Sequence, residues 1–82
     1  MTPSETEVEP GVLDLRGLKC PLPALFAKRT LERTPRGDSL TVLTDDPMAR
    51  IDVPHMCRQE GYEVVSVEAS NSVTKIVLQR PD

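Results

Sequence analysis

The chain has 82 residues, a formal net charge of -3, 38% hydrophobic residues, and only one Tyr and one Phe as aromatic residues. A chain of this length forms one domain at most, and its core must be aliphatic because aromatic side chains are so few. No apolar run approaches the ~20 residues of a membrane-spanning helix. The acidic balance and the scattered Lys and Arg residues argue against direct nucleic-acid binding, which uses a basic patch.

The first segment, "MTPSETEVEP", is polar and acidic and contains two prolines. We therefore predict a disordered tail over residues 1–11, followed by a single domain over residues 12–82. The segment lacks the basic and apolar regions of a signal peptide. We expect a cytoplasmic protein.

Residues 12–16, "VLDLR", alternate between apolar and polar side chains, which predicts a short strand. A helix is expected from Pro21 to about Thr34, because proline suits the first helical turn and the following "PRG" contains helix-stop residues. The run "SLTVLTD" alternates again and predicts a second strand.

A second helix is expected to begin at "DDP", with an Asp cap and Pro47 as its first residue, and Gly61 ends it. Pro54 lies inside this segment, which we expect to be continuous but irregular. The runs "YEVVSVEAS" and "SVTKIVLQR" are rich in β-formers and predict an antiparallel hairpin. The fold class is therefore α+β: a two-layer α/β sandwich of order βαβαββ, with two helices on one face of a four-stranded mixed sheet.

Cys20 is expected at the N-cap of the first helix. Unpaired N–H groups and the positive end of the helix dipole favour a thiolate there, and so does the adjacent Lys19. Pro21 and Pro23 make the first turn rigid but remove two N–H donors, so we expect a moderate lowering of the Cys20 pKa. These features predict a nucleophilic thiol; the alternative is a small residue that happens to begin a helix.

The second cysteine, Cys57, falls among the apolar residues Ile51, Val53 and Met56, and a core position is expected for it. A resolving thiol is the alternative. His55 is expected at the surface, and with the two cysteines it makes three zinc ligands, one short of a closed structural site. We expect no metal and no disulfide scaffold.

Three residues are candidates for contact with a partner protein. Leu25 lies off the line of small residues in the first helix, so it belongs either to a broad buried face or to an apolar docking patch beside the thiol. Lys28 is either a solvated cation or a charge that faces a partner. Asp46 is a helix-capping residue that could also approach the partner surface.

The stretch Leu13 to Pro23, "LDLRGLKCPLP", resembles the Leu-Asp-x-x-Gly-Leu-x-Cys-Pro-x-Pro motif of the TusA/SirA-like sulfur-carrier family. "LTVLTDDP" resembles the second strand of that family and the Asp-Pro after it, and "IDVPHMCRQEGYEV" resembles its second helix and the start of its third strand. The resemblance covers about residues 12–80 and implies the same βαβαββ sandwich.

The resemblance implies that Cys20 carries a persulfide, which a cysteine desulfurase or a rhodanese-like protein supplies and an acceptor protein removes. Destinations in the family include tRNA thiolation, molybdenum-cofactor enzymes and sulfur oxidation. The carrier itself needs no pyridoxal phosphate, metal or other cofactor, and we expect a monomer. The alternatives are a thiol-based regulatory module, a non-catalytic adapter that uses "KCPLP" as a rigid knob, and an RNA-binding protein, which the acidic charge disfavours.

Overall fold

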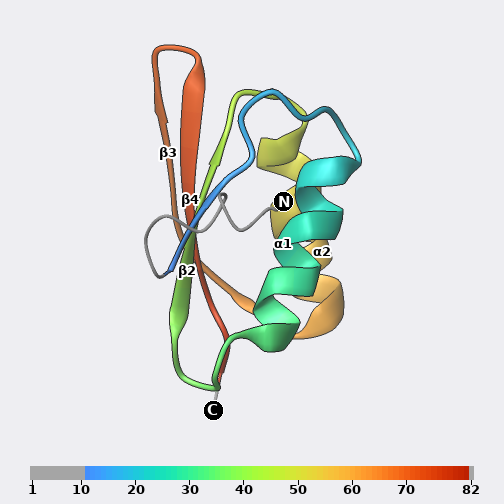
Figure 1. The fold of residues 1–82 in the computed structure, drawn as a ribbon, viewed down its shortest axis with the longest axis vertical. Coiled ribbons are helices and arrows are strands. Elements are labelled where there is room, and N and C mark those ends of the chain that lie inside the picture. Colours follow the sequence, from blue (N-terminus) through green and yellow to red (C-terminus); the bar gives the residue numbers. More distant parts are fainter. Residues whose placement is uncertain (1–10, 82) are drawn as a thin grey trace, which may run out of the picture.

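The computed structural model describes residues 11–81, so the predicted tail falls almost entirely outside the described residues. The elements are, in order, β1 (Val12–Asp14), α1 (Leu22–Arg33), β2 (Ser39–Thr44), α2 (Ala49–Glu60), β3 (Glu63–Ser70) and β4 (Val73–Gln79). Figure 1 shows one sheet with both helices against the same face. The predicted two-layer βαβαββ architecture is therefore confirmed. Neither described helix is long and apolar enough to cross a membrane.

The four strands lie in the order β1-β2-β4-β3. β1 and β2, which α1 connects, are parallel, whereas β4 is antiparallel to both of its neighbours. The hairpin prediction is confirmed, and Asn71 makes its tight turn with a φ of 58°. β4 thus lies between β2 and β3, and the sheet is mixed, as predicted, because it combines one parallel pair with two antiparallel pairs.

The core lies between the sheet and the helices, where the alternating strand residues point inward. β2 and β4 bury Leu40, Val42, Ile76 and Leu78. The helices contribute Pro23, Ala27, Leu31, Val53, Met56 and Cys57. At the start of α1, Pro23 is buried and Ala24 is partly buried against the core, whereas Ile51 of α2 is 61% exposed.

The second helix begins later than the sequence predicts. The carboxylate of Asp46 accepts the N–H of Met48 at 3.1 Å, and its carbonyl accepts the N–H of Ala49 at 3.0 Å. These bonds form a turn after β2, so α2 begins at Ala49. It runs without a break through Pro54, as expected, and ends at Gly61 in the left-handed conformation.

Candidate functional site

Two loops meet at one edge of the sheet. β1 and β2 are parallel, so their carboxyl ends point to the same edge. The loop after β1 leads into α1, and the loop after β2 leads into α2. Figure 1 shows both loops at the upper end of the molecule, where the two helices begin. Segments far apart in the chain therefore come together at this edge.

Two neighbouring aspartates of the second loop hold the first loop in place. The carboxylate of Asp45 accepts the N–H of Gly17, at 3.0 and 3.2 Å to its two oxygens. The carboxylate of Asp46 accepts the N–H of Cys20, and Asp46 is only 7% exposed. Gly17 has a φ of 92°, which side chains rarely allow. The backbone around Cys20 is therefore fixed by hydrogen bonds across 26 to 28 residues of sequence.

Cys20 precedes the N-cap of α1 instead of occupying it. The carbonyl of Lys19 accepts the N–H of Leu22 at 2.8 Å, and the Cys20–Pro21 peptide between them is cis. This turn places Pro21 at the N-cap and makes Leu22 the first helical residue. The predicted N-cap role of Cys20 is wrong by one residue, because the backbone turns before the helix begins.

The sulfur of Cys20 is exposed and lies beside a carboxylate of the other helix. Its thiol donates a hydrogen bond to Oδ2 of Asp52, with 2.6 Å between sulfur and oxygen. Asp52 belongs to the first turn of α2. This bond, together with the negative charges of Asp52 and Asp46, raises the pKa of Cys20. The predicted lowering of the pKa is therefore wrong: the sulfur donates a hydrogen bond to a carboxylate, which stabilises the protonated thiol.

Sequence reasoning missed Asp52. It lies 32 residues after Cys20, and the first turn of α2 had not been placed opposite the first turn of α1. The predicted topology contained the information needed to find Asp52. Parallel strands that each lead into a helix bring the first turns of the two helices together. Polar residues in both first turns were therefore candidates for the same site.

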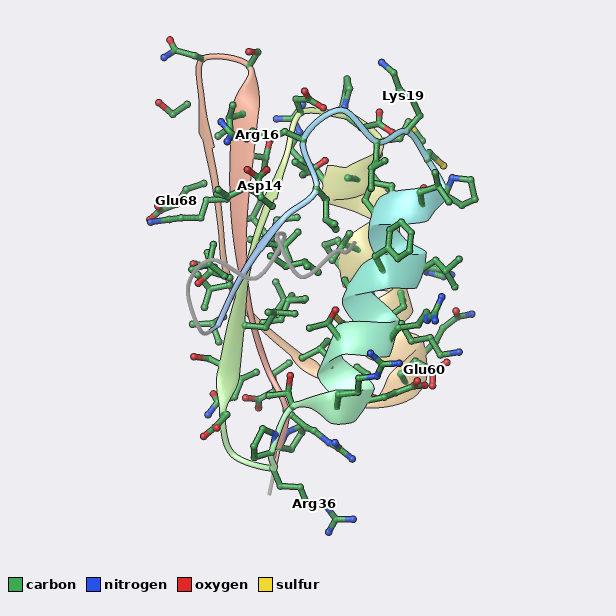
Figure 2. All side chains as sticks on the ribbon, viewed as in Figure 1. Asp14, Arg16, Lys19, Arg36, Glu60 and Glu68 are labelled. Atoms are coloured by element: carbon green, nitrogen blue, oxygen red, sulfur yellow. The ribbon has the colours of Figure 1, made fainter. Side chains whose placement is uncertain are left out.

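The predicted positioning residue Lys19 and the three predicted partner residues have different surroundings. Lys19 is exposed at the upper end of the molecule in Figure 2, and Leu25 is 46% exposed on α1. Lys28 lies 3.5 Å from Glu60 of α2, so it links the two helices. Asp46 is buried beneath the cysteine loop, which corrects its expected position at a partner surface. Its carboxylate supports the backbone of Cys20 instead.

Exposed apolar side chains surround the helix starts. These residues come from the first turns of α1 and from the start of α2, and they are 38 to 61% exposed. We call them the apolar rim; its members are Leu22, Leu25, Met48 and Ile51. Exposed apolar side chains near an accessible thiol are candidates for a protein-docking surface.

Cys57 has the core position expected for it. It is fully buried, and this burial raises its pKa to about 11. His55 is exposed, as expected. Within residues 11–81, no three His, Cys, Asp or Glu side chains are grouped so that they could hold a metal ion. Cys20 is thus the accessible thiol of the described chain.

A family model described as Sulfurtransferase TusA matches residues 11–80. The chain belongs to this family. Among TusA relatives, a Neisseria meningitidis serogroup A protein with the name "Putative sulfur carrier protein" is 43% identical over 67 residues, which cover 82% of this chain and 90% of the relative. A Buchnera aphidicola protein named sulfur carrier protein TusA is 27% identical over 73 residues, covering 89% of this chain and 92% of that protein.

A solved structure supports the same assignment. The crystal structure of a SirA-like protein from Desulfitobacterium hafniense matches with a TM-score of 0.75 and 28% identity. The match covers 87% of this chain and 97% of that one. The resemblance to the TusA/SirA-like family and its fold is therefore confirmed.

Proposed function

We propose that this TusA family member is a sulfur carrier in which Cys20 receives a sulfur atom from one protein and passes it to another. The observation that carries the proposal is the exposed thiol on a loop held by two aspartates. The apolar rim beside it offers a surface on which partner proteins dock. The names of the relatives support the same function.

Loading is a thiol–disulfide exchange in which no net oxidation occurs. The sulfur of Cys20 attacks the outer sulfur of a donor persulfide, R–S–SH, and a new sulfur–sulfur bond forms. The bond within the donor persulfide breaks, and the donor leaves as R–S⁻, which takes up the proton that Cys20 has lost. The products are a Cys20 persulfide and R–SH.

Unloading reverses the roles. A thiolate of the acceptor attacks the outer sulfur of the Cys20 persulfide, and Cys20 leaves as its thiolate before it is reprotonated. The carrier returns to its starting state, so each cycle moves one sulfur atom. The chemistry needs thiols on both partners and no cofactor on the carrier.

The proposed donor is a cysteine desulfurase or a rhodanese-like protein. The proposed acceptor belongs to a pathway of tRNA thiolation, molybdenum-cofactor synthesis or sulfur oxidation. Leu25, as part of the apolar rim, and Lys28 are the proposed contacts with these proteins, and Lys19, Pro21 and Pro23 position the thiol. Two free cysteines suit a reducing compartment such as the cytoplasm.

Intact mass spectrometry under non-reducing conditions tests this function. The protein is incubated with a cysteine desulfurase and free cysteine, and in a second arm with a rhodanese and thiosulfate. We expect the mass of one sulfur atom to be gained, to be lost on reduction, and to be absent in Cys20→Ser. No gain from either donor would reject the function, and a gain in Cys20→Ser would reject the assignment to Cys20.

A further inference from the structure

Asp52 touches the reacting atom of the proposed carrier, with its Oδ2 at 2.6 Å from the sulfur of Cys20. We propose that Asp52 keeps this sulfur protonated in the free carrier, and thereby restricts its reaction to partners that neutralise or displace the carboxylate. The inference rests on the proposed function for its biological role. Its chemical part, the control of thiol reactivity, is tested without any sulfur donor.

The surroundings of the sulfur offer little to stabilise a thiolate. At the start of α1, the N–H of Leu22 donates to the carbonyl of Lys19, and the N–H of Leu25 donates to that of Pro21. Pro23 has no N–H. The N–H of Cys20 itself donates to Asp46. The first N–H groups of a helix are normally free to stabilise an anion. Here most of them either donate to other acceptors or are absent because the residue is proline.

The charges near the sulfur also disfavour the thiolate form of Cys20. Asp52 of α2 and Asp46 of the β2–α2 loop are both negative, and both disfavour a second negative charge on Cys20. The cation nearest in sequence is Lys19, which is exposed. Lys28 of α1 lies further along the helix and pairs with Glu60. In the free carrier the sulfur is therefore held as a thiol by a direct hydrogen bond and by repulsion.

This arrangement makes the free carrier slow to react. The thiolate is the nucleophile in sulfur exchange, so small persulfides and oxidants that do not dock react slowly with a thiol that is mostly protonated. A partner that covers the apolar rim excludes water from the site, and a Lys or Arg beside its own reactive cysteine pairs with Asp52. The thiol then loses its hydrogen-bond acceptor and ionises more easily. The partner class that fits is a protein with a basic, apolar surface around its cysteine.

The test compares Asp52→Asn with Glu60→Gln in the full-length protein. Both variants remove one negative charge from α2, but Glu60 lies eight residues beyond Asp52, about 12 Å along the helix. Figure 2 shows Glu60 at the end of the helical layer opposite to Lys19. The rate of Cys20 alkylation by iodoacetamide is measured from pH 6 to pH 11, so that the range extends above the ordinary thiol pKa, and the modified residue is identified by mass spectrometry.

Asp52→Asn is expected to alkylate faster at pH 7 and to shift the midpoint of its pH profile downward. Each unit by which the Cys20 pKa falls gives about tenfold more thiolate, while the weaker nucleophile loses about threefold, so the net gain is about threefold. Glu60→Gln should keep the wild-type rate and midpoint. An Asp52→Asn rate equal to or below the wild-type rate would overturn the proposal, and so would an equal increase in Glu60→Gln.

Two further measurements test the control of Cys20 by Asp52 independently of the Asp52→Asn alkylation rate. Asp52→Ala removes the acceptor altogether, and its alkylation must also accelerate while its circular dichroism spectrum remains that of the wild type. Loading from a low-molecular-weight persulfide must rise in Asp52→Asn; an unchanged rate would contradict the restriction. If the wild type never takes up sulfur but Asp52→Asn still alkylates faster, the proposed function fails while the control of Cys20 by Asp52 stands.

Discussion

The two cysteines carry the same functional group in opposite environments. Cys20 is exposed and lies next to a carboxylate, so its reactivity depends on charges that a partner can change. Cys57 is fully buried, and its thiol stays protonated because burial disfavours the thiolate more than the charge of Arg58 favours it. Position in the fold, and not the thiol itself, decides which cysteine is suited to sulfur transfer.

Cys57→Ala is expected to load sulfur at the wild-type rate, because Cys57 does not take part in transfer. In the native wild-type protein, iodoacetamide at pH 8 should modify one cysteine, and in denaturant it should modify two. Mass spectrometry of intact protein measures both values. Modification of two cysteines in the native protein, or a loss of loading in Cys57→Ala, would contradict the buried, inactive role.

Cys57→Ala should also change how the stability of the fold depends on pH. Burial raises the pKa of Cys57 to about 11 in the folded state, so the protonated thiol favours folding. This stabilisation is complete below the ordinary thiol pKa and is lost as the pH rises toward 11. Urea unfolding from pH 8 to pH 11 should therefore show a steeper loss of stability in the wild type than in Cys57→Ala.

At the scale of elements, helix α1 is anchored differently at its two ends. Its start carries the cysteine loop, whereas its end is capped by a side chain from the last part of the chain. Nη1 of Arg80 donates to the carbonyls of Leu31, Glu32 and Thr34 at distances of 2.8 to 3.3 Å. A cation at this position also interacts favourably with the negative end of the helix dipole. The end of α1 is thereby tied to the end of β4.

Arg80→Met should destabilise the fold by about 1–2 kcal/mol, because the helix-end carbonyls lose a charged donor. For a domain of this size the melting temperature should fall by roughly 5–10 °C. Arg36→Met serves as the control, because Arg36 is exposed and points away from the ribbon in Figure 2. Thermal unfolding measures both variants, and sulfur loading should be unchanged in each. Equal melting temperatures would show that the cap contributes little.

The elements could be predicted because their signals are local. Alternation marks the strands, and prolines and glycines mark the limits of the helices within one to three residues. The strand order could not be predicted in this way, because the insertion of β4 between β2 and β3 depends on pairing between distant segments. The same distinction applies to the candidate site. Cys20 could be predicted from its local motif, whereas Asp52 could not, because it reaches Cys20 only through the contact between the first turns of the two helices.

At the scale of the whole molecule, the reactive cysteine and the Arg80 cap that stabilises α1 lie at opposite ends. The parallel pair β1 and β2 sends both helices out from one edge, where the cysteine loop is held by Asp45 and Asp46. The Arg80 cap lies at the other end, at the last turn of α1. Substitutions near the Arg80 cap should therefore leave the reactivity of Cys20 nearly unchanged, and substitutions near Cys20 should leave the stability that the cap contributes nearly unchanged.

This separation predicts how the molecule responds to oxidation. Cys20 is exposed, whereas Cys57 is buried in the core, about 7.5 Å further along α2 than Asp52. A disulfide between the two cysteines would require the core to open, so oxidation by diamide should join two molecules through Cys20. Each new bond takes two electrons from two thiols, and diamide accepts them.

Size-exclusion chromatography and non-reducing gel electrophoresis measure the product of this oxidation. The reduced protein should elute as a monomer, and diamide should convert it into a disulfide-linked dimer that a reductant separates. Cys20→Ser should remain a monomer, while Cys57→Ala should form the dimer as the wild type does. An oxidised monomer that contains an internal disulfide would instead make Cys57 a resolving thiol. That result would favour a redox-regulatory module over a carrier, because a carrier needs its single reactive thiol free at the edge where partners dock.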